Sequence, residues 1–155
     1  MLERVAGCLP HLTTLYLYGG LITLVDSDWL QTTSLVDTRS SKLRSISFSN
    51  FTLAPRLFEV LLALPSLRQV SFWQFVIPEP ELIMSVFKKH RETPKESATV
   101  GIISLTISFW NRGGCWSTEL MLEMIACLPH LKSCAFYGND STRSAIKEKH
   151  PHIRL

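Results

Sequence analysis

Two segments hold the residues best suited to chemistry, Cys8-Leu-Pro-His11 and Cys127-Leu-Pro-His130. Thiolate and imidazole are common zinc ligands, and His150 and His152 could supply further nitrogen atoms. Both segments, however, stand at the same point of a phrase that recurs along the chain. If its copies stack as neighbouring strands, the two pairs lie four strands and about 19 Å apart. Because zinc ligands all lie within roughly 2.0–2.3 Å of the metal, we predict no metal site, only buried thiols and surface histidines at a turn.

Motifs of catalysis and nucleotide binding are missing from the sequence. It contains no G-x-S-x-G segment, no phosphate-binding glycine loop, no H-E-x-x-H and no spaced Cys-x-x-Cys pairs. Gly19-Gly20 and Gly113-Gly114 follow expected strands, where turn geometry explains them. Glu79 and Glu81 lie at the start of an expected helix, so they suit the helix dipole better than a general acid and base pair. We therefore expect a protein that is not an enzyme and has no cofactor.

The composition is that of a folded chain without a membrane span. Of the 155 residues, 46% are hydrophobic and 19% charged, with a net charge of +3. No apolar run reaches the roughly 20 residues of a membrane helix, and no signal peptide is apparent. The pattern predicts a cytoplasmic or nuclear protein with reduced cysteines. The basic run Lys88–Lys95 is too short for a nucleic-acid-binding stripe and suits a helix end.

The elements that must position any site come from a repeated phrase, L-P-x-L-x-x-L-x-L. Its clearest copies are Cys8–Tyr18, Ala63–Trp73 and Cys127–Tyr137. Two copies lack Leu-Pro, and a sixth begins at His150. Counting from the leucine after the proline as frame position 1, this position falls at Leu12, Leu43, Leu67, Ile102, Leu131 and Ile153. Spacings of 22 to 35 residues leave room for one strand and one helix or loop per copy.

The frame predicts short strands separated by helices. Apolar residues at positions 4 and 6 share one face of a strand, because side chains two apart point the same way. A helical apolar period favours helices over 55–63 and 117–126, with Ser117 as N-cap, and over a segment opened by Pro78-Glu-Pro-Glu81 that carries Leu82, Ile83, Val86 and Phe87. Proline restricts the residue before it, so Leu-Pro ends each clear helix.

This order of elements resembles the leucine-rich repeat family along essentially the whole chain. The resemblance implies a right-handed α/β solenoid of residues 1–155, about five repeats plus a partial sixth, with parallel strands on the concave face and helices on the convex face. The family usually has Asn or Cys at position 9, as Asn139 does here, whereas Gly20, Phe51, Phe75 and Trp110 indicate an aromatic spine. Because the chain starts and ends within repeats, we expect a fragment of a longer protein.

The expected binding surface is formed by side chains that alternate with the core positions. Position 7 supplies Tyr18, Trp73 and Tyr137, position 8 supplies Phe109, and position 2 supplies Arg44, Arg68 and Lys132. Exposed aromatic and arginine side chains on one surface are typical of protein-binding hot spots. The alternative is that the inserts 18–42 and 73–101 cover these rings. A strand register error of one residue would also turn them inward.

Irregular repeats with Leu-Pro-x-Leu resemble those that follow F-box domains in fungal and plant proteins. The resemblance implies a protein-binding scaffold that would hold the substrate of a ubiquitin ligase, with an adaptor bound only if an F-box lies outside this chain. A nucleic-acid-binding array is the alternative, and a repeat domain of an enzyme is a weaker one. We expect no membrane partner.

Overall fold

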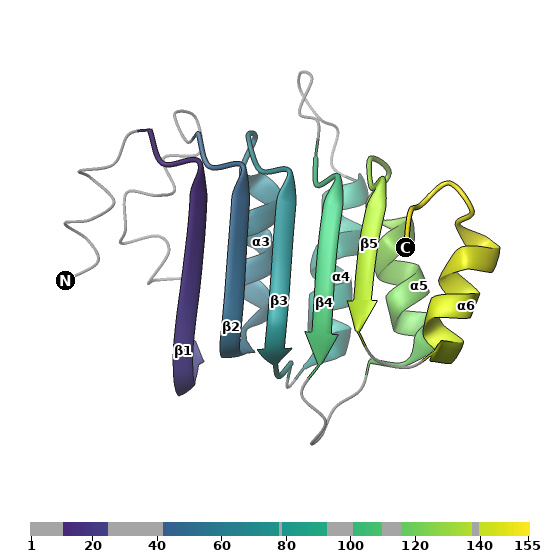
Figure 1. Ribbon diagram of the computed structural model, residues 1–155, viewed down its shortest axis with the longest axis horizontal. Helices are drawn as coiled ribbons and strands as arrows, with labels where there is room; N and C mark the ends of the chain where they lie inside the picture. The colour runs from purple at the N-terminus through teal and green to yellow at the C-terminus, as the bar shows by residue number, and fades with distance from the viewer. Residues whose placement is uncertain (1–10, 25–41, 78, 93–100, 110–115, 138–139) are drawn as a thin grey trace.

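The computed structural model describes residues 11–24, 42–77, 79–92, 101–109, 116–137 and 140–155, without the side chains of 20–24 and 109. Five strands form one sheet: β1 (Thr14–Leu24), β2 (Ser45–Leu53), β3 (Gln69–Phe75), β4 (Ser104–Phe109) and β5 (Ser133–Tyr137). All neighbouring strands are parallel, and their order in the sheet is their order in the chain (Figure 1). The predicted α/β class with parallel strands is therefore confirmed.

Four helices accompany these strands in the described part of the chain: α3 (Pro55–Ala63), α4 (Pro80–Glu92), α5 (Thr118–Ala126) and α6 (Asp140–Lys149). Figure 1 shows α3, α4 and α5 behind the sheet and α6 beside its β5 edge, so these helices cover one face only. We call this the covered face and the opposite one the open face. A strand-to-strand connection with a helix behind the sheet is the usual way to keep neighbours parallel.

The strand register follows the repeated phrase residue by residue. Residues at frame position 4 pair along the sheet, and so do those at positions 3, 5, 6 and 7. The position 4 row is Leu15, Ile46, Val70, Leu105 and Cys134, and the position 6 row is Leu17, Phe48, Phe72, Ile107 and Phe136. From β2 to β4 both rows are buried, as is Cys134. The predicted inward side of the frame is thus correct.

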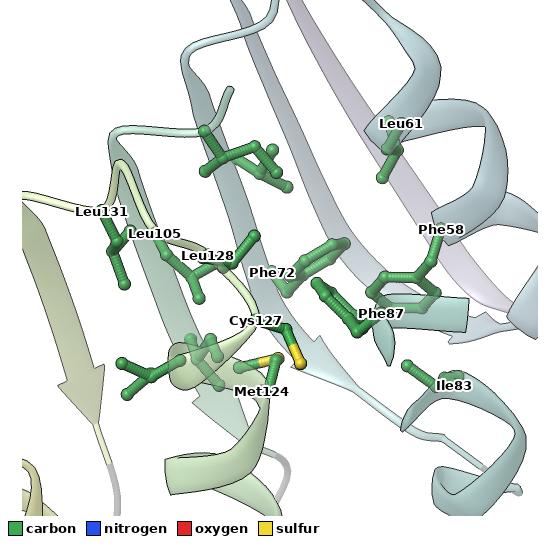
Figure 2. Close-up of a cluster of buried hydrophobic side chains, with 14 of the residues drawn as sticks. Phe58, Leu61, Phe72, Ile83, Phe87, Leu105, Met124, Cys127, Leu128 and Leu131 are labelled. Atoms are coloured by element: carbon green, nitrogen blue, oxygen red, sulfur yellow. The ribbon is translucent and has the colours of Figure 1, made fainter. Parts of the chain in front are cut away.

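Aromatic rings fill the layer between the sheet and the helices. Phe48 stacks on Phe72 with ring centroids 5.6 Å apart, and Phe58 of α3 lies 5.4 Å from Phe72. Phe87 of α4 lies 5.8 Å from Phe58. Figure 2 shows these helix rings meeting the strand ring of Phe72. Ring centroids in this range add packing energy beyond simple burial, so the cluster joins strand and helix layers firmly.

Helix ends and turns repeat with the phrase. Helix α3 has the predicted bounds and ends before Leu64, whose backbone is extended. At α5 the predicted cap is present, because Ser117 Oγ accepts a hydrogen bond of 3.2 Å from the Leu120 N–H. Three copies share one hydrogen bond in the turn before the strand, in which the N–H at position 1 donates to the carbonyl three residues earlier. It joins Leu67 to Leu64, Leu131 to Leu128 and Ile153 to His150. The sixth copy therefore has the local geometry of the complete ones.

Regularity is lost where the strands end. Asn50 and Gln74, both at position 8, have positive φ angles of 62° and 51°. Beyond them the β3–β4 register shifts, so Phe75 pairs with Phe109 rather than with the residue after it. The predicted aromatic spine is present at the described side chains, since Phe75 is buried and Phe51 packs against the core. Trp110 and Asn139 lie outside the described residues.

The prediction of a turn at Gly19-Gly20 is wrong, because both residues lie inside β1. A Cβ at Gly19 would come within 2.5 Å of Phe51 Cε1 and 2.9 Å of the Asn50 carbonyl oxygen. Real Cβ atoms do not approach other atoms so closely. The glycine is therefore required by the ring packed against the strand. Gly113-Gly114 lies outside the described residues.

Two further details of the helices differ from the sequence pattern. Helix α6 was not expected, because its only buried residues are Thr142 and Ile146 and all its other residues except Ala145 are polar. Leu82, part of the expected apolar face of α4, is 50% exposed. Within the described residues, no helix combines the length and the apolar character that crossing a membrane requires.

Candidate functional site

The open face is built from side chains at positions 3, 5 and 7 of each strand. They alternate with the buried positions 4 and 6, so the pleat of the sheet turns them away from the helices. Most are small: serine occupies seven of the fifteen places, at 45, 47, 49, 71, 104, 108 and 133, and threonine or alanine occupies three more, at 14, 106 and 135. Large rings stand out against this background.

Two of these rings form a pair across the sheet. Trp73 of β3 and Tyr137 of β5 occupy position 7, on either side of Ser108 in β4. Their ring centroids are 5.4 Å apart and the ring planes are tilted by 33°. Trp73 stays 37% exposed and Tyr137 56% exposed. The pair is therefore held together by mutual contact while presenting apolar surface to solvent.

The other large side chains of the open face belong to β1. Tyr18 is 81% exposed and Tyr16, two residues earlier, is 77% exposed. Both lie beside the serines of β2, because Tyr16 pairs with Ser47 and Tyr18 with Ser49. Within the described part of the chain, neither tyrosine makes a ring contact like the one that joins Trp73 to Tyr137. The open face thus carries an isolated aromatic group at β1 and a paired one over β3 to β5.

The floor between the large side chains is shallow and hydroxyl-rich. Ser133 Oγ donates a hydrogen bond of 3.0 Å to Ser104 Oγ, which ties β5 to β4 across the open face. Ser71 is buried although it is polar, because it lies low between neighbouring strands. Hydroxyl groups both donate and accept hydrogen bonds. This floor can therefore bond to the backbone of a bound chain.

Four cations lie where the strands begin, at frame position 2, and we call them the basic rim: Arg44, Arg68, Lys132 and Arg154. Their backbones are linked strand to strand, since Arg68 N–H donates to the Arg44 carbonyl at 2.8 Å and Arg154 N–H to the Lys132 carbonyl at 2.9 Å. Arg44, Lys132 and Arg154 are exposed and Arg68 is half-buried. Arg68 Nη1 donates to the carbonyls of Pro65 at 2.8 Å and Leu67 at 2.9 Å. The Arg68 guanidinium is therefore fixed over its own turn.

The structure places the predicted site residues in two groups rather than one. Trp73 and Tyr137 come together, whereas Tyr18 on β1 lies two strands from Trp73 and four strands from Tyr137. Arg44, Arg68 and Lys132 lie along the rim at the opposite ends of the strands. Phe109 pairs through its backbone with buried Phe75, and its side chain lies outside the described residues. This pairing follows the register shift between Trp73 and Phe75, and the role of the Phe109 side chain stays a prediction.

Sequence reasoning missed two residues that share these rows. Tyr16 stands at position 5 with the small residues, and its exposure exceeds that of Trp73. Arg154 stands at position 2 of the sixth copy and forms a parallel bridge with Ser133, so it continues the basic rim. The signal for both was present in the repeated frame. For Arg154, this signal was obscured by the shortness of the last copy.

The cysteine and histidine residues do not form a metal site in the described part of the chain. Cys127 is a buried free thiol, His130 is exposed, and burial raises the pKa of the Cys127 thiol above its ordinary value. At the other edge of the sheet, His11 Nδ1 contacts Lys42 Nζ at 3.2 Å. No group of three or more His, Cys, Asp or Glu side chains among the described residues could hold a metal ion. Cys8 lies outside them.

The basic run at the end of α4 joins two helices. Lys88 Nζ lies 2.7 Å from Glu123 Oε1 of α5. This hydrogen bond and the charge of Glu123 raise the pKa of Lys88. Lys89, His90 and Arg91 fall in the last turn of α4, where the helix dipole favours cations. The described part of the run therefore lies at a helix end, as predicted, and Lys95 lies outside the described residues.

The described surface thus offers one face with exposed rings and a row of cations at the beginnings of its strands. No protein-family model matches the chain, and none of the curated proteins or solved structures is significantly similar to it.

Proposed function

We propose that the chain is a leucine-rich-repeat-like solenoid that binds another protein through the open face of its sheet. The observation that carries this proposal is the exposed Trp73 and Tyr137 pair on a face that no described helix covers. Aromatic rings at the centre of a surface supply much of the energy of protein association. The matching register of all five strands supports the solenoid, because each repeat contributes one strand in sequence order.

We further propose that the bound protein is a substrate presented to a ubiquitin ligase. This part rests on the resemblance of Leu-Pro-x-Leu copies to the arrays that follow F-box domains. An adaptor of the ligase would then contact an F-box that lies outside residues 1–155. Its test is the open reading frame around the coding sequence of this chain, translated and inspected for an F-box helical domain. A complete frame without that domain would contradict the ligase role and leave the binding face untouched.

Protein capture by the immobilised full chain tests the binding proposal. Trp73→Ala should remove the proteins that the wild type retains, because a central aromatic residue typically contributes about 2 kcal/mol or more, roughly thirtyfold in affinity. Retained proteins are identified by quantitative mass spectrometry. Circular dichroism of both forms shows that the fold persists.

Leu82→Ala is the matched control for this experiment. Leu82 is also a large, exposed apolar side chain, but it lies on α4 in the helix layer. We expect this variant to retain the same proteins as the wild type. Equal retention by Trp73→Ala and the wild type, or equal loss in both variants, would contradict binding through the open face.

Nucleic acid is the other candidate ligand, favoured by the basic rim. Its binding falls steeply with salt, because each neutralised phosphate releases counterions. A nucleic-acid ligand would also disappear from the retained material after nuclease treatment. We expect capture to survive nuclease and to depend on Trp73, which distinguishes a protein ligand. Loss of all capture after nuclease would favour the nucleic-acid function instead.

A further inference from the structure

We propose that a second surface, the edge of the molecule at which the strands begin, binds the phosphate backbone of a double-stranded nucleic acid. This goes beyond the proposed function, because the open face keeps its protein ligand and the two surfaces use different residues. Three features of the described residues support the second surface: the concentration of cations at one edge, their arrangement in a row, and the absence of rings and apolar side chains beside them.

The described cations concentrate at one edge of the fold. Each helix runs back between two parallel strands, so the last turn of a helix lies at the same edge as the turns that precede the strands (Figure 1). We call this the basic edge: the turns 11–13, 42–44, 64–68, 101–103, 127–132 and 150–154 and the last turns of α3 to α6. Nine of the twelve described Lys and Arg residues lie there: Lys42, Arg44, Arg68, Lys89, Arg91, Lys132, Lys147, Lys149 and Arg154.

Few negative charges oppose these cations. Three of the eight described acidic residues lie at the basic edge, Glu92, Glu123 and Glu148. Glu123 is already paired, at 2.7 Å, with Lys88 one turn farther along α4. The fold therefore gathers at one edge cations that are scattered along the sequence, and it leaves most acidic side chains elsewhere.

Helix ends explain only part of this excess. The cations of α4 and α6 lie in last turns, where the helix dipole stabilises them. Each of the four helix C-termini carries about half a negative charge, roughly two in all, which is less than the excess of six formal positive charges. Four exposed cations of the basic edge belong to no helix: Lys42, Arg44, Lys132 and Arg154.

These four exposed cations form a row across the sheet layer. Arg44, Lys132 and Arg154 belong to the basic rim, and Lys42 lies two residues before Arg44. The row extends from β2 to the sixth copy, which is four strand spacings or about 19 Å. Arg68 lies within the row but binds the carbonyls of its own turn, so we do not count it as a ligand-binding group. A partner that uses the whole row must carry negative charge over this length.

The charge density of a nucleic-acid duplex suits such a row. A duplex carries about one negative charge per 1.7 Å of its axis, so roughly eleven phosphates lie along 19 Å. The planar guanidinium groups of Arg44 and Arg154 can each bind a phosphate through two hydrogen bonds. On the surface of a folded protein, acidic side chains alternate with other residues and cannot match every cation in the row. Continuous charge therefore favours a duplex.

The rest of the basic edge points to contacts with the backbone of the duplex. Single strands are usually held by bases stacked on aromatic rings, and membrane surfaces by apolar side chains that enter the bilayer. Among the described residues, the large apolar side chains that are exposed all lie away from this edge: Tyr16, Tyr18, Trp73, Val76, Leu82 and Tyr137. Phosphate contacts carry no sequence information, so we expect binding that does not depend on base sequence.

Fluorescence anisotropy of the full chain with labelled duplexes tests this proposal. The probes are duplexes of about 20 base pairs, as DNA and as RNA, each in two unrelated sequences. If four to six phosphates are neutralised, the affinity should fall by about two to three orders of magnitude between 50 and 200 mM salt. The two sequences should bind within about twofold of each other. One strand of the same length should bind severalfold more weakly, because no ring is present to stack on its bases.

Two double variants that remove equal charge locate the binding surface. Arg44→Gln, Lys132→Gln should lower the affinity for the duplex about tenfold at 50 mM salt and reduce the logarithmic salt slope by about 2. The matched control is Arg56→Gln, Arg143→Gln, which removes two exposed cations from the first turns of α3 and α6, at the opposite edge. We expect the control to change the affinity less than about threefold, with the same salt slope as the wild type. Circular dichroism checks the folding of both variants.

Equal effects of the two double variants would overturn the proposal, and so would an affinity that changes less than about fivefold over this salt range. Two further probes separate other anionic partners. Oligoglutamate bound as tightly as the duplex would indicate an acidic protein segment instead, and equally tight binding of vesicles that contain phosphatidylserine would indicate a membrane surface. None of these results affects the open face, because its Trp73-dependent capture is measured after nuclease treatment.

Discussion

The two faces of the sheet use aromatic side chains in opposite ways, as neighbouring residues of β3 illustrate. Phe72 is buried and contacts rings from β2, from α3 and from its own strand. Trp73 points to the open face and contacts one ring, that of Tyr137, beside solvent. Of two successive residues, the first thus holds the sheet and helix layers together, and the second has a ring that remains available for binding. Stability and binding should therefore be separable by substitution along one strand.

The largest expected effect is at the covered face. Phe72→Ala should lower the free energy of unfolding by about 3–5 kcal/mol, because it removes a buried ring and leaves a cavity. Trp73→Ala should cost about 1 kcal/mol or less, mainly the ring contact with Tyr137. Urea unfolding followed by circular dichroism measures both. Similar losses in the two variants would break the proposed contrast between the faces.

Gly19 tests the part of β1 where its register with β2 shifts. Gly19→Ala should destabilise the protein by about 1–3 kcal/mol, because its Cβ would overlap Phe51. The double variant Gly19→Ala, Phe51→Ala removes the ring that the Cβ would meet. We expect it to cost clearly less than the sum of the two single substitutions in the same unfolding assay. An additive pair of effects would show that the close approach does not restrict this position.

The ionisation and reactivity of a thiol can be compared between the two faces, at Cys134 on the covered face and at Ala135 on the open face. Burial raises the pKa of the Cys134 thiol from 9.0 to about 11. The unfolded chain then loses this proton at lower pH than the folded one, so the contribution is complete below pH 9 and declines as the pH rises toward 11. The decline should be roughly 1–2 kcal/mol. Unfolding measured at pH 8 and pH 10.5 should show a smaller decline in Cys134→Ala than in the wild type.

The labelling rate of the same thiol gives a second measurement. At pH 8 folded Cys134 should resist a thiol reagent, whereas a cysteine introduced by Ala135→Cys on the open face should react readily. Peptide mass spectrometry assigns each modification. Fast labelling of Cys134 in folded protein would contradict its burial.

The smallest of these effects concerns the helix layer. Ser117→Ala should destabilise the protein by about 1 kcal/mol, because the Leu120 N–H loses its capping acceptor. Helix α3 offers the reverse change, since Ala54 has extended N-cap geometry and no side-chain cap. Ala54→Ser should therefore be neutral or slightly stabilising in thermal unfolding. Neither variant should alter ligand binding at the open face, and a binding defect in either would weaken the separation of the two layers.

Much of the fold could be predicted because the repeated phrase combines two short-range signals. The alternation of Leu105 and Ile107 with polar residues indicates a strand face, and the apolar period of residues 55–63 indicates a helix. Both signals depend on neighbouring residues, so they can be read locally. Helix α6 could not be found in this way, because few of its side chains are apolar and its burial comes from packing beside α5. Ile146 is completely buried there, and Thr142 Oγ1 lies 2.7 Å from Thr118 Oγ1.

The candidate site was predicted less completely than the fold. The alternation of residues assigned Trp73 and Tyr137 to one face, but their contact depends on two rings reaching across Ser108. Counting placed Phe109 at position 8, but it could not show that the β3–β4 register shifts after the left-handed backbone of Gln74, so that Phe109 pairs with Phe75. Such a bulge depends on packing between strands, and no short sequence pattern predicts it.

By itself, the sequence determined the strand frame, the row of buried positions and the separation of the two Cys-Leu-Pro-His segments. These follow from the pleat and from the turn bonds that return with each copy, both of which are local properties of the chain. Only the tertiary structure decided which varied residues meet, namely Trp73 with Tyr137 across Ser108 of β4. Their neighbourhood depends on the register between strands that lie 64 residues apart in sequence, and this register is set by how the covered face packs against its helices.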